Sequence, residues 1–342
     1  MHVILNSSTS FDAPLNNTTT IPSTRNIDTV LIIATAPYSA DHVMALWTQL
    51  ECITDGIDRV LISAPDTSWS KEIISLVIDH FTKLSSNVTT FILEAAFNVN
   101  NRYDVGLWCD GIDHICDHDP ITTSAAAPRA IFLINDSAPA LQRYDALTNQ
   151  TVAANQNNQL SNSNTTNNMN NRGSVKLISL NGDLTYPKMD KTWVESVYRD
   201  LTPDGLSTFY QHSCSAKQRR KCACKRDDNA KNCIVEHFEI ALAREYLPLE
   251  LDVMFPAFPP KEWNTSSWEA SNGPIQRSYW EHWLYGKQYF WYLYEVHDFP
   301  FRKLKWPEGR PPSTSQCLEL LDGKTHFFDK LPYPSNDVLR EY

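Results

Sequence analysis

Between residues 29 and 93, continuous apolar runs alternate with segments in which apolar residues recur at helical spacing. Three continuous apolar runs, rich in β-branched residues, predict strands buried on both faces at 29–35, 59–63 and 88–93. Between these runs, apolar residues recur at helical spacing over 40–52 and 70–84. The predicted apolar faces are Val43, Leu46, Trp47 and Leu50, and then Ile73, Ile74, Val77, Ile78 and Phe81. This order of elements predicts right-handed crossovers and a mostly parallel sheet flanked by helices, an α/β fold.

Regular structure is expected to continue beyond this unit. A helix is predicted at about 104–114 and a fourth buried strand at 130–134. A fifth strand is predicted at 175–180, and the patterns of 191–198 and 235–246 indicate helices. Ligands of parallel sheets bind at the carboxyl ends of the strands, so the residues that follow each strand are the first candidates for a site.

Segments of biased composition flank or interrupt the predicted sheet. Residues 1–28 are polar and are expected to be a disordered leader, whereas 29–310 are expected to form one domain. Within that domain, 148–173 are rich in Asn, Gln, Ser and Thr, which predicts a disordered surface insertion. A basic, Cys-rich loop is predicted at 213–233. An aromatic extension follows, and we predict that residues 311–342 form a C-terminal tail.

Composition supports a globular domain and excludes one class of partner. The chain has 342 residues, of which 42% are hydrophobic, enough to bury a large core. Its formal net charge is -10, and an acidic surface repels phosphate backbones, so nucleic acid is not an expected partner. The sequence shows no apolar run of the length that spans a membrane and no secretory signal.

Two features bear on the cellular compartment. Sequons for N-glycosylation occur at Asn6, Asn17, Asn87, Asn149 and Asn264. The chain has 8 cysteines, which permit disulfides of the kind formed in a secretory lumen. We therefore expect the Golgi or another secretory lumen. The alternative is a cytoplasmic protein whose cysteines are reduced and buried.

The first candidate site follows the third predicted strand. Polar residues cluster there at Asn98, Asn100, Asn101, Arg102 and Asp104. In one interpretation the cluster is a loop in which Asp104 caps the next helix. In the other, Arg102 and Asp104 face a ligand above the carboxyl edge of the sheet.

The second candidate site follows the fourth predicted strand, at Asn135, Asp136 and Ser137. A carboxylate in this position can hold a divalent cation, a ribose or a sugar hydroxyl. Mg²⁺ and Mn²⁺ prefer oxygen ligands, often carboxylates together with substrate phosphates. The alternative is a plain turn or helix cap, for which Asn-Asp-Ser is well suited.

The Cys-rich loop is a third candidate. It contains Cys214, Cys222, Cys224 and Cys233, with His212 nearby. One interpretation is a zinc-stabilised interaction module. The cysteines of this loop, however, lack the pairs separated by about two to four residues that common zinc sites contain. In a secretory lumen one or two disulfides are favoured instead, and reduced thiols are the remaining alternative.

The two strand-end motifs also occur in a familiar order. Asn-Arg-Tyr-Asp-Val-Gly-Leu-Trp at 101–108 precedes Ile-Phe-Leu-Ile-Asn-Asp-Ser-Ala-Pro-Ala at 131–140. Over roughly residues 29–247, the chain resembles the rhamnan-synthesis-type glycosyltransferases and related algal and fungal glycosyltransferase-like proteins. That family shows N-x-G-x-D-x-G and then L-N-D-S-x-x-G-P. This chain departs from the pattern at Arg102 and at Ala140, near positions where the family has glycine.

The resemblance implies a glycosyltransferase A-type, Rossmann-like fold. It also implies transfer of a sugar from a nucleoside diphosphate donor to a glycan or glycoprotein acceptor, with Mg²⁺ or Mn²⁺ as a cofactor. Asp136 would contact the metal or the diphosphate, and Asp104 the nucleotide. Arg102, Asn135 and Ser137 would complete the donor site.

The resemblance further suggests catalytic and acceptor-binding residues. Glu236 is the candidate base that deprotonates the acceptor hydroxyl, and Glu239 is its substitute. A glutamate at a helix start is also favoured by the helix dipole alone. Trp193 and His212 would contact the acceptor. Ala138 stands where a second metal-binding carboxylate is expected, so the alternative function is a non-catalytic carbohydrate-binding or scaffold protein on the same fold.

Overall fold

The computed structural model of the chain describes residues 3–5, 29–54, 56–84, 91–99, 103–118, 130–137, 139–140, 175–179, 182–183, 193–194, 198–201, 203–220, 222, 233–234, 237–238, 252–254 and 316–341. Its strands are β1 (Val3–Leu5), β2 (Thr29–Ala34), β3 (Arg59–Pro65), β4 (Ile92–Asn98), β5 (Ala130–Asn135), β6 (Val175–Ser179), β7 (Gly182–Asp183), β8 (Trp193–Val194), β9 (Tyr198–Leu201) and β10 (Asp252–Met254). Its helices are α1 (Ala40–Cys52), α2 (Ser68–Leu84), α3 (Tyr103–His118), α5 (Pro203–Phe209), the π-helical turn η2 (Tyr210–Cys214), α6 (Ala216–Arg219), α11 (Gln316–Glu319), α12 (Thr325–Phe328) and α13 (Asn336–Glu341).

The main sheet has eight strands in the order β1-β4-β3-β2-β5-β9-β6-β10. Strands β1, β4, β3, β2 and β5 pair in parallel, whereas β9 runs antiparallel to both β5 and β6. The mostly parallel α/β sheet predicted from the sequence is therefore confirmed. Among the described helices, none has the length and apolarity needed to cross a membrane.

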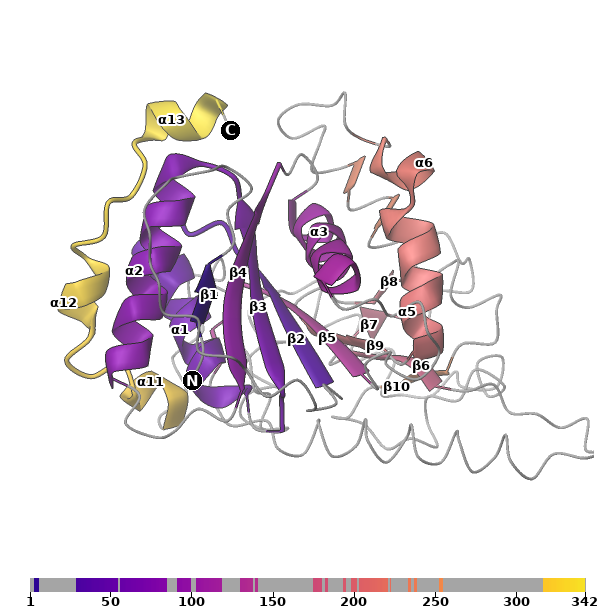
Figure 1. Cartoon of the computed structure of the whole chain (residues 1–342), viewed down its shortest axis with the longest axis horizontal. Coiled ribbons are helices and arrows are strands. Elements are labelled where there is room, and N and C mark those ends of the chain that lie inside the picture. The colour runs from indigo at the N-terminus through magenta and orange to yellow at the C-terminus, as the bar shows by residue number, and fades with distance from the viewer. Residues whose placement is uncertain are drawn as a thin grey trace, which may run out of the picture.

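Helices cover both faces of the parallel part of the sheet (Figure 1). Helix α1 connects β2 to β3 and α2 connects β3 to β4, and both lie on one face. Helix α3 connects β4 to β5 and packs on the opposite face, against β2, β3 and β4. The chain thus crosses the sheet between β4 and β5, and β5 is placed on the far side of β2.

The predicted apolar faces of α1 and α2 are buried as expected. Every residue of β2, β3 and β5 is buried as well, in agreement with strands covered on both sides. In α1 the inward residues are Val43, Leu46, Trp47 and Leu50, and in α2 they are Ile73, Ile74, Val77, Ile78 and Phe81. Helical period and β-branched runs were sufficient to define this core.

Strand β4 differs from its prediction, because it covers Ile92–Asn98 rather than ending at Leu93. The polar residue Glu94 interrupts the apolar pattern that the prediction followed. In the structure Glu94 is buried and forms an ion pair with Arg59 of β3, and His114 of α3 lies 3.8 Å from it. Burial raises the pKa of Glu94, but hydrogen bonds from His114 and Arg59 and the charge of Arg59 outweigh burial and hold this pKa below its usual value.

The prediction of a helix at 191–198 is wrong. This segment contains β8, which pairs with β7 in a separate two-stranded sheet, and the first residue of β9. Pairing with β5 and β6 fixes β9 in the main sheet. Such pairing between segments distant in sequence outweighs the helical pattern of residues 191–198. The helix predicted at 235–246 lies almost entirely outside the described residues.

Two terminal segments take part in the fold. Val3–Leu5, in the segment expected to be a disordered leader, pairs with β4 as strand β1. Residues 316–341, in the predicted C-terminal tail, form α11, α12 and α13, of which α11 and α12 contact α1. A disulfide between Cys52 and Cys317 joins α1 to α11. Phe327 and Phe328 of α12 pack their rings against Trp47.

Gly111 marks the closest approach of α3 to the sheet. A Cβ atom at this position would lie 2.8 Å from Cγ2 of Ile32 and 3.4 Å from Cβ of Ser63. We expect Gly111→Ala to lower the free energy of unfolding by about 1–3 kcal/mol, because overpacking outweighs the gain in helix propensity of about 1 kcal/mol. Chemical denaturation measures this loss. The loss should shrink in an Ile32→Ala background, and an unchanged loss there would contradict the proposed clash.

Candidate functional site

The strand order reverses at β2. Successive strands β2, β3 and β4 extend the sheet in one direction, and β5 then returns to the other side of β2. The carboxyl ends of β2 and β5 therefore lie side by side, at the edge of the sheet where open α/β sheets bind ligands. Thr35 and Ala36 follow β2 here, and Asp136 follows β5.

Asp136 is fixed to the end of β2 by hydrogen bonds. Its Oδ2 accepts a hydrogen bond from Oγ1 of Thr35 at 2.7 Å and another from the backbone N–H of Ala36 at 2.9 Å. Its own N–H donates to the carbonyl of Ala34 at 3.1 Å. The residue is only 5% exposed. The carboxylate is thus held rigidly between the two strand ends.

Asn135 joins this carboxylate to the start of α3. Its Nδ2 donates to Oδ2 of Asp104 at 2.8 Å, and its Oδ1 accepts from the backbone N–H and the hydroxyl of Ser137. Asp104 lies in the first turn of α3, where the helix dipole stabilises a negative charge. The two sequence motifs after the third and fourth predicted strands therefore meet at one edge of the sheet.

The end of β5 is supported from both helical layers. Nε2 of Gln49 in α1 donates to the carbonyl of Asn135 at 2.7 Å. Nε1 of Trp108 in α3 donates to the carbonyl of Ile134 at 2.9 Å. These two buried side chains fix the backbone that carries Asn135 and Asp136. Such support is what a precisely positioned ligand-binding carboxylate requires.

Tyr38 is a site residue that sequence reasoning missed. It is half-buried in the loop after β2, and its ring packs on His42 with 4.0 Å between the ring centroids. Burial raises the pKa of its hydroxyl, and the charges of Asp136 and Asp104 raise it further. Both carboxylates are therefore close enough to influence one phenol. The signal in the sequence was its place just after the first buried strand.

Tyr103 begins α3 in an unusual conformation. Its φ of 52° lies in the left-handed region, which costs a non-glycine residue on the order of 1 kcal/mol. Its side chain is 51% exposed, although it is large and aromatic. Strained residues of this kind concentrate at ligand-binding sites. Because Tyr103 directly precedes Asp104, the strain lies beside the candidate site.

Burial raises the pKa of Asp136 to about 7. Below the ordinary aspartate pKa of 3.8 the group is protonated in both the folded and the unfolded chain. As the pH rises from about 4 to about 7, the unfolded chain releases the proton while the folded chain retains it, so this group lowers the free energy of unfolding. Above about 7 both states are ionised and the effect is constant.

We therefore expect the stability of the wild type to fall relative to Asp136→Asn as the pH rises across this window. Asparagine keeps the shape of the side chain but does not titrate. Urea denaturation of both proteins at a series of pH values measures the difference. Parallel stability curves would contradict a buried carboxyl with a raised pKa.

The donor chemistry at this edge fits Mg²⁺ or Mn²⁺. Asp104 and Asp136 supply carboxylate oxygens, and these ions are held by one or two carboxylates together with substrate phosphates. Thr35 and Ala36 both donate to Oδ2 of Asp136, so Oδ1 retains capacity for a further ligand. A cation would also favour the ionised form of this buried carboxyl.

The structure describes two of the other residues predicted for the site and leaves three outside the described part of the chain. Trp193 lies in β8 of the small two-stranded sheet rather than in a helix. His212 lies half-buried in η2, which packs on α3 and α5. Arg102, Glu236 and Glu239 lie outside the described residues.

The Cys-rich loop forms disulfides, in agreement with the favoured prediction. Cys214 of η2 is bonded to Cys109 of α3, and Cys222 is bonded to Cys233. The first bond attaches η2 to the helix that carries Asp104. Next to it, Arg219 of α6 pairs with Asp110 at 2.7 Å and with Asp113, both in α3.

No protein-family model matches the sequence, and no curated protein matches it. Similar solved structures include mouse xyloside xylosyltransferase 1 in its apo form, with 11% identity, a TM-score of 0.31, and coverage of 66% of this chain and 84% of that one.

Two further solved structures are similar. The apo structure of the bifunctional glycosyltransferase WbbM has 8% identity and a TM-score of 0.41, with coverage of 94% of this chain and 52% of that one. The mannosyltransferase Ktr4p from S. cerevisiae in complex with GDP has 6% identity and a TM-score of 0.33, with coverage of 66% and 69%. The chain thus spans about half the length of WbbM. These similarities are remote, so what the site can do is judged from its own residues.

Proposed function

We propose that the chain is a glycosyltransferase that moves a sugar from a nucleoside diphosphate donor to a glycan or glycoprotein acceptor. The observation that carries this proposal is the hydrogen bond from Asn135 to Asp104 beside the buried carboxylate of Asp136. It joins the two motifs on which the family resemblance rests. It does so where the strand order reverses, the position at which nucleotides bind to sheets of this kind.

The donor end of the proposed site is built from the described cluster. Asp136 would bind the cation that accompanies the diphosphate, and Asp104 would contact the nucleotide. Asn135 and Ser137 would bind donor hydroxyls. The metal, Mg²⁺ or Mn²⁺, would offset the charge that develops on the leaving diphosphate. Arg102 would add a positive charge for the phosphates, since a guanidinium binds phosphate in bidentate geometry.

The acceptor end of the proposed site rests on residues named from the sequence. Glu236, or Glu239 in its place, would accept the proton of the attacking acceptor hydroxyl as the bond to the donor forms. Trp193 and His212 would contact the acceptor. The disulfides of the described chain suit an oxidising compartment, and we propose the Golgi or another secretory lumen.

Binding of nucleoside diphosphates tests the proposal directly. We expect calorimetry to detect one of UDP, GDP or dTDP binding to the purified protein, with higher affinity when Mn²⁺ is present. The gain from Mn²⁺ should increase as the pH rises through about 7, because the cation binds the ionised form of Asp136. Absence of binding to all three nucleotides would contradict the proposal.

A non-catalytic carbohydrate-binding or scaffold protein is the second candidate. The observation that favours it is the structural use of Asp136, whose Oδ2 already holds the end of β2 in place. Ala138 also stands where a second metal-binding carboxylate would be expected. This candidate predicts glycan binding that is independent of nucleotide and of metal, together with no binding of nucleoside diphosphates.

A further inference from the structure

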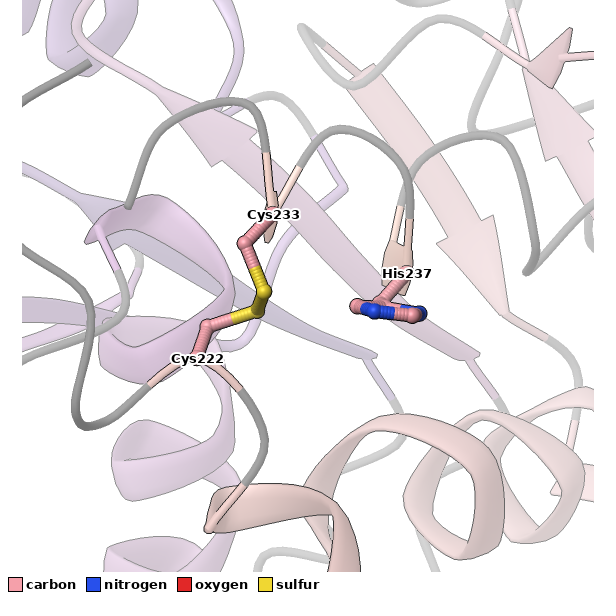
Figure 2. Close-up of side chains that lie close together, drawn as sticks. All are labelled: Cys222, Cys233 and His237. Atoms are coloured by element: carbon pink, nitrogen blue, oxygen red, sulfur yellow. A yellow bond between two sulfur atoms is a disulfide. The ribbon is translucent and has the colours of Figure 1, made fainter. Parts of the chain in front are cut away.

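A sulfur-rich cluster contains none of the residues of the candidate donor site. It consists of the disulfide Cys222–Cys233 and the imidazole of His237, with all three potential ligand atoms within 4.8 Å of one another. Figure 2 shows the ring of His237 beside the bonded sulfur atoms. Among groups of three or more His, Cys, Asp or Glu in the described part of the chain, this one alone has the spacing of a metal site.

The spacing of the cluster fits a tetrahedral zinc site. Zinc binds thiolate sulfur at about 2.3 Å and imidazole nitrogen at about 2.0–2.1 Å, so neighbouring ligand atoms lie roughly 3.5–3.8 Å apart. The cluster is within side-chain adjustment of that arrangement. Breaking the S–S bond allows the two sulfurs to move from bonding distance to this separation. Two cysteines and one histidine would leave a fourth position for water or another ligand.

Among the disulfides of the described residues, the one in this cluster is the most open to reduction. Cys222 is 7% exposed and Cys233 is half-buried. In contrast, the exposed fraction is at most 1% for each of the other bonded cysteines, Cys52, Cys109, Cys214 and Cys317. Because thiol–disulfide exchange requires access to the sulfur, a reductant reaches Cys222–Cys233 first. The folded core therefore remains cross-linked when this bond opens.

We propose that reduction of Cys222–Cys233 creates a Cys₂His site for Zn²⁺, with His237 as the third ligand. A thiol or phosphine reductant supplies two electrons to the disulfide and is oxidised itself, and the two sulfurs take up protons as thiols. Zinc then displaces one proton from each thiol and binds the neutral imidazole of His237. The disulfide and the zinc site exclude each other, because the same two sulfur atoms form either the S–S bond or the bonds to zinc.

None of the residues of this site belongs to the cluster around Asp136, but His237 lies between Glu236 and Glu239, the proposed bases of sugar transfer. The consequence of this site is that the loop between Cys222 and Cys233 can be closed in either type of compartment. In an oxidising lumen the disulfide closes it, and in a reducing environment the metal does. The chain separation of 11 residues is closed in both cases.

Cobalt titration of the folded protein tests the proposal. The protein is treated with a limited amount of phosphine reductant, and alkylation with mass spectrometry confirms that Cys222 and Cys233 are the thiols released. Co²⁺ is then added as a spectroscopic substitute for Zn²⁺. We expect one Co²⁺ per chain, a thiolate charge-transfer band and tetrahedral d–d bands, and displacement of Co²⁺ by Zn²⁺. The oxidised protein should give none of these signals.

Matched variants identify the ligands. Cys222→Ser should abolish the charge-transfer band of a two-thiolate site, and His237→Ala should weaken Co²⁺ binding by about tenfold or more. His212→Ala serves as the control for a nearby histidine and should leave the spectrum unchanged. Circular dichroism confirms that each variant is folded. Bands that persist in Cys222→Ser and His237→Ala, or absence of binding to the reduced wild type, would overturn the proposal.

Discussion

Asp136→Ala should reduce donor-dependent sugar transfer by on the order of 100-fold or more, the largest loss of activity expected for a single substitution in this chain. The carboxylate lies at the reversal of strand order and is the proposed contact for the metal and the diphosphate. Its removal would eliminate that charge and release Thr35 and Ala36, both of which donate to it. Transfer or donor-hydrolysis assays with each nucleotide sugar measure the change.

A matched aspartate separates this effect from a loss of stability. Asp58 lies at the opposite edge of the sheet, and its Oδ2 accepts from the N–H of Thr29 at 3.1 Å and from Oγ1 of Thr29 at 3.0 Å. Asp58 thus accepts hydrogen bonds from a threonine hydroxyl and a backbone N–H, as Asp136 does. Unlike Asp136, it does not lie at the carboxyl ends of the strands. Asp58→Ala should lower stability and leave kcat unchanged in the folded fraction. Unchanged transfer by folded Asp136→Ala would refute the role of Asp136.

Removal of the Cys52–Cys317 disulfide should have the largest effect on stability. The two cysteines are separated by 265 residues in a chain of 342, so the bond restricts about three quarters of the unfolded chain. Loop-closure entropy for a separation of this size corresponds to about 5 kcal/mol, and we expect Cys52→Ser with Cys317→Ser to lose about 3–5 kcal/mol. Both sulfurs are buried against the core, which adds to the loss. Guanidinium denaturation under non-reducing conditions measures it.

The Cys222–Cys233 bond provides the control for this prediction. Its separation is 11 residues, for which the same relation gives a loss of about 3 kcal/mol or less. The double serine variant at these positions should therefore be clearly more stable than the one at Cys52 and Cys317. Equal losses for the two pairs would show that chain entropy is not the main contribution of the longer bond.

The sequence predicted the parallel core well because the apolar pattern that marks each strand or helix lies within the residues of that element. Runs such as Val30–Ile33 are apolar without interruption, and a strand covered on both faces has this pattern whatever its neighbours are. The extent of β4 was not predictable in this way. Glu94 breaks the apolar run, and only the folded sheet brings Arg59 and His114 beside it. Strand β9 is likewise fixed by partners distant in sequence.

The candidate site was predictable to the same degree. Asp104, Asn135, Asp136 and Ser137 were identifiable because polar residues directly after buried strands gather at one edge of a parallel sheet. The hydrogen bond from Thr35 to Asp136, and the presence of Tyr38, depend on which strands are neighbours. The cysteine pairs were unpredictable for a related reason. Spacing in sequence does not reveal that Cys109 and Cys214 face each other across two helical segments.

Helix α3 connects the candidate donor site to the layer formed by η2 and α6. Asp104 is in its first turn, whereas Cys109, Asp110 and Asp113 farther along bind Cys214 and Arg219. From Asp104 to Asp113 the helix spans roughly 14 Å at 1.5 Å per residue. The Cys109–Cys214 disulfide and the ion pairs of Arg219 therefore join the outer layer to the same helix that carries, about two and a half turns away, a carboxylate of the candidate site.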